Sequence, residues 1–80
     1  MDTITAIKSR ILNLCAERDV SINRLATMCA LPPSTIKNIL YGRSVDPKIL
    51  TLKKICDGLE ITIAEFFTTS EFDTLEQEIK

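Results

Sequence analysis

Two neighbouring prolines, Pro32 and Pro33, interrupt a helical pattern of apolar residues near the middle of the chain. The second proline suits the first turn of a helix, a position that needs no backbone N–H, and the residue before a proline is held extended. A helix cannot run through the pair, so one helix must end before it and another must begin at Pro33. The sequence therefore predicts two short helices joined by a turn of about three residues.

Both segments beside the prolines have the pattern of amphipathic helices. Ser21 is a good N-cap, because its hydroxyl can accept a backbone N–H from the first turn. Gly42 is expected to end the second helix, over residues 33–41, in a left-handed C-cap. Apolar residues recur at helical spacing on one face of each segment: Leu25, Ala26 and Cys29 in the first, and Ile36, Ile39 and Leu40 in the second.

So short a turn forces the two helices to cross steeply around a shared apolar patch. We expect this patch to consist of Leu25, Cys29, Leu31, Ile36 and Ile39. The polar side of the second helix must then face outward.

The order and spacing of residues 7–67 resemble those of the Cro-type, lambda-repressor-like (XRE family) helix-turn-helix domain of bacterial and phage regulators. The resemblance covers about three quarters of the chain. It implies an all-α, five-helix fold and a regulator that binds double-stranded DNA. The residues that carry it are Leu25-Ala26, Leu31, Ser34-Thr35-Ile36, Ile39, Gly42-Arg43, Pro47, Thr51-Leu52, Ile55, Leu59, Ile61 and Phe66.

Three residues depart from the family pattern. Ala30 stands where the family often has Gly in the turn, which would cost roughly 1 kcal/mol in a left-handed conformation. Ile22 replaces a Gln that often follows the N-cap and contacts a phosphate or a base. Pro33 occupies the commonly polar second position of the recognition helix. These departures affect the DNA contacts more than the fold.

In such a domain the outward residues near the start of the second motif helix reach base edges in the major groove. Lys37 can donate to guanine O6 or N7, and Asn38 can bond adenine bidentately. Alternatively, Ser34 only helps to start the helix, Lys37 is a charge that keeps the surface soluble, and Asn38 is a polar residue that faces solvent. The expected base contacts are Pro33, Ser34, Thr35, Lys37 and Asn38.

The family commonly places phosphate contacts just past the recognition helix, here at Tyr41 and Arg43. The free N–H groups after Ser21 form a second anchor for phosphate. Tyr41 could equally pack at the edge of the core. The expected phosphate contacts are Ser21, Ile22, Asn23, Arg24, Tyr41, Arg43 and Lys48. Of these Arg24 and Lys48 are weaker candidates, as are Lys8 and Arg10.

A chain of 80 residues can build a single core. We therefore expect one helix-turn-helix domain that spans residues 1–69, followed by an acidic, helical tail that spans residues 70–80. Besides the motif, we expect a helix from about Thr3 to Arg18 with Asp2 or Thr3 as its cap. Another is expected to open at Asp46-Pro47 and run to near Leu59. A capping box predicts a helix after Thr62, and Ser70 is expected to cap the tail helix.

Charge is unevenly distributed along the chain, although the net charge is −1. Residues 1–54 contain nine basic and four acidic residues, a balance of +5. Residues 55–80 contain one basic and seven acidic residues, a balance of −6. One face could therefore meet DNA while the other repels it. The alternative is an ordinary surface of solvated charges.

The sequence lacks patterns of catalysis and metal binding. It has no His, no Gly-rich phosphate loop and no nucleophile with an evident base, so we expect neither enzyme activity nor a cofactor. Cys15, Cys29 and Cys56 are too widely spaced for a zinc ribbon, and their apolar helical positions favour buried thiols over a redox switch. No apolar run is long enough to span a membrane and no signal-peptide pattern is present, so we expect a cytoplasmic protein.

A DNA-binding protein with so few base contacts would gain affinity by dimerising on DNA. We expect a transcriptional repressor that binds duplex DNA as a homodimer and needs no small-molecule ligand. The alternative is a protein-interaction module of the same fold, with few DNA contacts, that docks a partner through its acidic C-terminal segment. The apolar residues Phe66, Phe67, Phe72, Leu75 and Ile79 could form the dimer or partner surface, or could fold back onto their own domain.

Overall fold

The computed structural model describes residues 1–79 and is all-α, as predicted; Lys80, the last residue of the expected tail, lies outside the described residues. Residues 1–79 contain no strand. The elements are α1 (Thr3–Glu17), α2 (Ile22–Cys29), α3 (Pro33–Tyr41), α4 (Ile49–Gly58), α5 (Ile63–Phe66) and the 3-10 turn η1 (Ser70–Asp73). Over these residues, no helix has the length and apolar character needed to cross a membrane.

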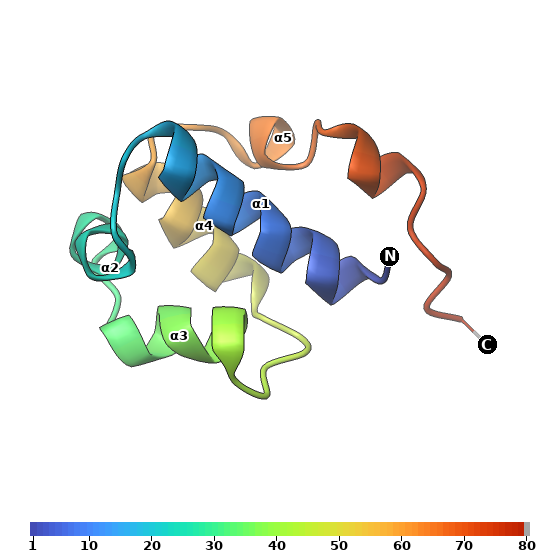
Figure 1. Cartoon of the computed structure of the whole chain (residues 1–80), viewed down its shortest axis with the longest axis horizontal. Helices are drawn as coiled ribbons and strands as arrows, with labels where there is room; N and C mark the ends of the chain where they lie inside the picture. Colours follow the sequence, from blue (N-terminus) through green and yellow to red (C-terminus); the bar gives the residue numbers. More distant parts are fainter. Residues whose placement is uncertain (80) are drawn as a thin grey trace.

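The helices enclose one apolar core (Figure 1). In this view α1 crosses the middle of the molecule in front of α4, α3 lies along the lower edge, and α5 and η1 lie above. Helix α2 contacts both α3 and α4, and α5 contacts α4. The apolar side of α1 is buried at Ile7, Ile11, Leu14 and Cys15, and Ile4 is half-buried. The largest fully buried side chains are Phe66, Ile11, Leu25, Ile36, Ile55 and Cys56.

Side-chain caps open three of the helices as the sequence predicts. The Thr5 N–H donates to Asp2 Oδ1 at 3.0 Å. The Thr5 side chain and, after it, this backbone bond lower the pKa of the Asp2 carboxyl. The Arg24 N–H donates to Ser21 Oγ at 3.0 Å. Thr62 and Glu65 form the reciprocal capping box, with bonds of 3.0 and 3.2 Å. Pro33 is the first residue of α3, where a missing N–H costs nothing.

Three helices end in a left-handed residue that is not glycine: Asp19 after α1, Ala30 after α2 and Glu60 after α4. In each case the N–H of the next residue donates to a carbonyl five residues back, as in a Schellman motif. These bonds run from Val20 to Cys15, from Leu31 to Ala26 and from Ile61 to Cys56, at 2.9, 3.0 and 3.0 Å. The apolar residues Val20, Leu31 and Ile61 then pack against the core.

Replacing Ala30 by glycine is expected to stabilise the protein by about 0.5–1 kcal/mol. Ala30 has φ 55° and ψ 40°, a left-handed conformation that strains a residue with a Cβ. Glycine removes this strain, and the free energy gained exceeds the free-energy cost of glycine's greater conformational entropy in the unfolded chain. Urea denaturation measures the difference. Ala16→Gly, on the exposed side of α1, is the matched control and should destabilise by about 1 kcal/mol. A loss of stability in Ala30→Gly would contradict this reading.

One expected cap conformation and one expected helix start are wrong, although α3 ends before Gly42 as predicted. Gly42 has φ −96° and ψ −151°, which is extended backbone and no left-handed cap. Its missing Cβ matters because an ideal Cβ there would lie 2.9 Å from Asn38 Cα, too close for real atoms. Helix α4 does not open at Asp46-Pro47 but at Ile49, after the extended residue Lys48. Pro47 is instead half-buried in the loop that joins α3 to α4, and this loop packing outweighs the local cap signal.

The C-terminal segment is also less helical than predicted. Ser70 is the first residue of the single turn η1 and provides no side-chain cap. Residues 74–79 are irregular, because the chain there follows the start of α1. The Glu76 N–H donates to the Met1 carbonyl at 3.2 Å, and the Thr3 hydroxyl donates to Glu78 Oε2 at 2.9 Å. The acidic tail is thus fastened to the amino end of the domain.

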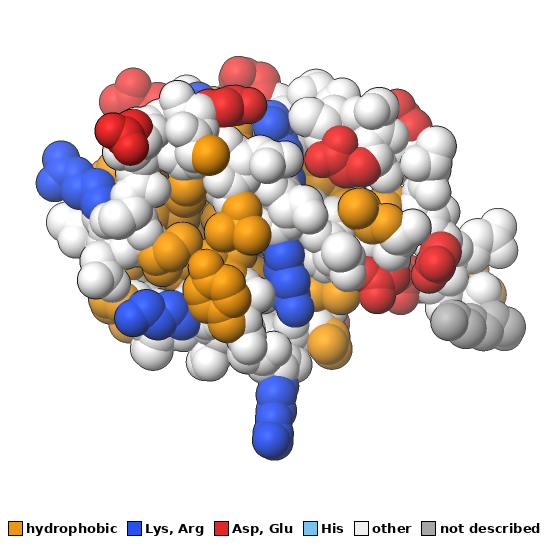
Figure 2. Space-filling model, viewed as in Figure 1, with side chains coloured by type: hydrophobic (Ala, Val, Ile, Leu, Met, Phe, Trp, Pro, Cys, Tyr) orange, Lys and Arg blue, Asp and Glu red, His pale blue; other side chains and the backbone are white. Residues whose placement is uncertain are grey.

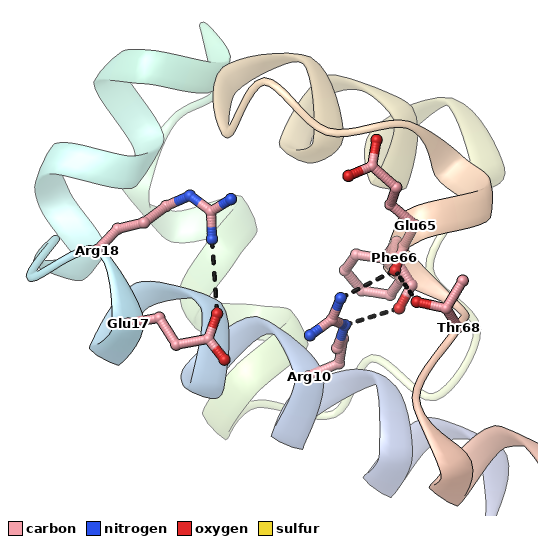
Figure 3. Close-up of polar contacts among 6 residues, drawn as sticks. All are labelled: Arg10, Glu17, Arg18, Glu65, Phe66 and Thr68. Atoms are coloured by element: carbon pink, nitrogen blue, oxygen red, sulfur yellow. Dashed lines mark hydrogen bonds and ion pairs between the residues drawn. The ribbon is translucent and has the colours of Figure 1, made fainter.

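Arg10 joins α1 to the end of α5 (Figure 3). Its Nε donates to the Phe66 carbonyl at 2.7 Å and one terminal nitrogen donates to the Glu65 carbonyl at 2.9 Å. These carbonyls lie at the end of a helix, where the Glu65 carbonyl also accepts the Thr68 hydroxyl at 2.7 Å, and a guanidinium fork can reach both. Arg10 therefore links α1 to α5, and its guanidinium is engaged by backbone carbonyls.

All three cysteines are buried free thiols, as predicted. Burial raises the pKa of each, that of Cys29 to about 11. We expect iodoacetamide to leave the native protein unlabelled at pH 8 and to label three sites in urea, which mass spectrometry can count.

The same thiols make stability depend on pH. Above about pH 8.5 the unfolded chain loses its thiol protons while the folded chain keeps them, so the unfolded state is favoured. The free energy of unfolding should therefore fall between about pH 8.5 and 11, measured by urea denaturation. The matched control is a variant with all three cysteines replaced by alanine, which should show a shallower decline. Equal declines in both proteins would contradict the assignment to thiols.

Candidate nucleic-acid interface

Helix α3 presents one continuous polar stripe to solvent. Ser34, Lys37, Asn38 and Tyr41 are all exposed, and their spacing of three, four and seven residues places them on one side of a helix. We call these four residues the α3 stripe. The opposite side, Ile36, Ile39 and Leu40, is buried in the core. Of the expected base contacts, Pro33 is also exposed, while Thr35 is half-buried at the flank of the stripe.

A shallow polar groove runs beside the stripe, between α3 and the start of α4. Its volume is about 380 Å³, and its lining residues are Thr35, Asn38, Ile39, Ser44, Asp46, Pro47, Lys48 and Thr51. The half-buried Thr35 therefore faces this groove, whereas Asn38 belongs to both the groove and the stripe. An ideal Cβ on Gly42 would lie 3.0 Å from Asn38 Oδ1, so the glycine leaves room for that amide. No local pattern in the sequence indicated that Ser44 and Thr51 would line the same groove.

The start of α2 offers a second place for an anion. The Ser21 hydroxyl is engaged by the Arg24 N–H, and no hydrogen bond in residues 1–79 uses the N–H groups of Ile22 and Asn23. Such free N–H groups and the helix dipole favour a phosphate. The Ile22 side chain packs against the core, so only its backbone is available for a contact. Asn23 and Arg24 are exposed.

The basic side chains around α3 are exposed and free of ion pairs. Within the described residues, the ion pairs are Arg18 with Glu17 and Lys53 with Asp57. Lys37, Arg43 and Lys48 are therefore open to external anions, and Lys48 additionally borders the polar groove. Lys8, a weaker candidate, is half-buried on α1.

Charge is segregated over the surface as the sequence suggests. In Figure 2 most acidic side chains lie along the upper edge and at the right, whereas basic side chains lie at the left, in the centre and at the lower edge beside α3. A surface that approaches DNA through α3 would keep most carboxylates away from the phosphates.

The apolar residues considered for a dimer or partner surface are mostly used within the domain. Phe66 is fully buried, and the rings of Phe67 and Phe72 pack edge to face with centroids 4.9 Å apart. Both rings lie against the core, and Leu75 is half-buried. Ile79 alone among the five is largely exposed, at 88%. This arrangement corresponds to the folded-back alternative for the three aromatic residues.

Two helices joined by a tight turn, with an exposed polar stripe on the second and free basic side chains at its end, define a helix-turn-helix DNA-binding domain. The family model of the Cro/C1-type HTH DNA-binding domain matches residues 10–71, and the chain belongs to this family.

A solved structure has the same architecture. The crystal structure of the prophage Lp1 protein 11 is 30% identical in sequence and superposes with a TM-score of 0.80. The match covers 94% of this chain and 100% of that one. No curated protein sequence matches the chain. The family model therefore gives DNA binding as the activity of the family, and the solved structure shows the same fold.

Proposed function

We propose that this protein is a sequence-specific transcriptional repressor that reads the major groove of duplex DNA with α3 and binds as a homodimer in the cytoplasm. The observation that carries the proposal is the α3 stripe, a polar and partly basic surface on the helix that this family uses for DNA. Residues 1–69 form the DNA-binding unit, with residues 70–80 as an attached acidic tail. Repression follows from occupying a promoter.

The proposed base contacts differ in reach. Lys37 and Asn38 are exposed on the stripe and are long enough to meet base edges, Lys37 at guanine and Asn38 at adenine. Ser34 reaches only locally. Pro33 and the Thr35 methyl offer apolar contact to a thymine methyl. Specificity thus rests mainly on two side chains.

Phosphate contacts would hold α3 in position from both ends. At one end the backbone of Ile22 and Asn23, with Arg24 and the capped Ser21, meets one strand. At the other end Tyr41, Arg43 and Lys48 meet the backbone across the groove. Arg24, Arg43 and Lys48 form no ion pair in the described part of the chain, so their binding to phosphate breaks none.

Selection from a randomised duplex-DNA pool at roughly physiological salt tests this function. We expect a two-fold-symmetric motif to be enriched, and to fade when Lys37 is replaced by alanine. Lys53→Ala is the matched control, because it removes the same charge from α4, where Lys53 pairs with Asp57. A folded wild-type protein that enriches no motif would refute sequence-specific binding.

The second candidate function is a protein-interaction module. It is favoured by Ile22 and Pro33, which replace polar family residues, and by the acidic tail with its exposed Ile79. This candidate predicts no enrichment from the DNA pool and capture of a partner that is lost in Ile79→Ser.

A further inference from the structure

A cavity of about 610 Å³ lies between the start of α1, the loop after α3 and the tail. In Figure 1 the amino terminus and the tail lie at the right-hand end of the molecule, and α2 lies at the opposite end. None of the proposed DNA contacts lines this cavity, so it is separate from the nucleic-acid interface. A concave site of this volume is large enough to hold a ligand. Its apolar lining consists of Ile4, Ile7, Val45 and Pro47.

Four carboxylates line the same cavity, those of Asp2, Asp46, Glu76 and Glu78, and the lining includes no basic side chain. The ion pairs of residues 1–79 lie elsewhere, so none of these carboxylates is paired with a cation of the described chain. Like charges gathered around one cavity create a negative potential that attracts cations. We call this site the acidic cavity.

Each segment that forms the acidic cavity also exposes a large apolar side chain. Met1, Val45 and Ile79 are 54%, 73% and 88% exposed. Val45 is itself a lining residue, and Met1 and Ile79 adjoin lining residues along the chain. Apolar area therefore extends beyond the cavity, as it does on surfaces that contact another protein. A small cation would leave these side chains in water, whereas a segment of a protein can cover them.

Two sides of the acidic cavity are already fastened to each other. The Glu76 N–H donates to the Met1 carbonyl at 3.2 Å, and the Thr3 hydroxyl donates to Glu78 Oε2 at 2.9 Å. The Glu78 carboxylate keeps further lone pairs for a cation. A partner therefore does not have to order the tail, which lowers the entropy cost of binding.

We propose that the acidic cavity is the docking site for a basic, partly aliphatic segment of a partner protein. An aliphatic side chain of that segment fills the cavity against Ile4 and Ile7, and lysine or arginine residues beside it meet the carboxylates. The inference goes beyond the proposed function, because docking leaves the α3 stripe free. A protein that binds DNA as proposed would hold this partner at the same promoter.

Nuclear magnetic resonance of the nitrogen-15-labelled full chain tests the site without DNA, so its outcome is independent of the proposed function. The probe is a short, end-blocked peptide of alternating lysine and leucine. We expect a Kd on the order of 0.1–1 mM and shifted amide signals at residues 2–7, 45–46 and 76–78. Glutamate in place of lysine, or glycine in place of leucine, should weaken binding about tenfold or more. No binding, or shifts spread evenly over the acidic residues of α4, α5 and η1, would overturn the inference.

Matched variants separate the acidic cavity from the overall charge of the chain. Asp46→Asn combined with Glu76→Gln should weaken binding of the lysine–leucine peptide about five- to tenfold. These side chains make no hydrogen bond or ion pair in residues 1–79, so the fold should persist, as the same spectra will show. The control, Glu71→Gln combined with Asp73→Asn, removes equal charge outside the cavity and should change affinity less than twofold. Equal weakening by both pairs would overturn the inference.

Discussion

Replacing Phe66 by alanine is expected to cost about 4 kcal/mol of the free energy of unfolding. The side chain is fully buried and touches both the helical core and the ring of Phe67, whose centroid is 4.8 Å away. The guanidinium of Arg10 lies 6.0 Å from the ring centroid as well. A chain of this size has a total stability of roughly 4–12 kcal/mol, so the substitution should remove between about a third and all of it.

Circular dichroism during urea denaturation measures the loss. Phe66→Leu keeps most of the buried volume and should cost much less, about 1–2 kcal/mol. Phe72→Ala is the matched control in the same aromatic cluster. Its ring is only half-buried, so a loss of about 2 kcal/mol is expected. A Phe66→Ala protein as stable as wild type would show that the core does not depend on α5.

Features decided by local chemistry were predictable from the sequence. The caps at Ser21 and Thr62 bind N–H groups within three residues, and Pro33 acts at its own position in the chain. The strain at Ala30 was also foreseeable, because its turn position implied a left-handed backbone in which any Cβ is strained. Apolar spacing then decided which side of α3 faces outward. These signals sufficed for the fold and for most of the candidate interface.

Features decided by contacts between distant segments were not predictable. Asp46-Pro47 has the local pattern of a helix start. In the structure, however, both residues belong to a loop that lines two cavities, and the helix begins at Ile49. Gly42 matches a C-cap, yet what requires glycine there is the closeness of Asn38. The tail residues have helical spacing, but hydrogen bonds to Met1 and Thr3 hold that segment in an irregular path.

The role of Arg10 shows the same limit for function. In sequence it is one of several basic residues in the positive part of the chain and a candidate for phosphate. In the structure its guanidinium binds two carbonyls some 55 residues away, a partner that no local pattern identifies. Charge counts alone therefore overestimate the cations available to DNA, and the useful ones are those without an internal partner.

Arg43→Ala and Asn38→Ala should impair DNA binding in different ways, and the contrast tests the proposed arrangement of α3. Arg43 follows the helix end as an exposed, unpaired cation, so we expect it to neutralise one phosphate. Its loss should weaken binding to every sequence and lower the slope of log K against log salt by about one. Asn38 is uncharged and lies on the α3 stripe, so its loss should leave that slope unchanged.

The cost of Asn38→Ala should instead fall on one base position. A bidentate amide contact to adenine contributes about 1–3 kcal/mol of discrimination, so affinity for the selected site should drop roughly 10- to 100-fold while affinity for sites altered at that adenine barely changes. Fluorescence anisotropy over a salt series measures the salt slope and the affinity of both variants for the selected site and for the altered site. If Asn38→Ala weakened every site equally, the amide would be contributing to the fold or to the backbone contacts and not to base reading.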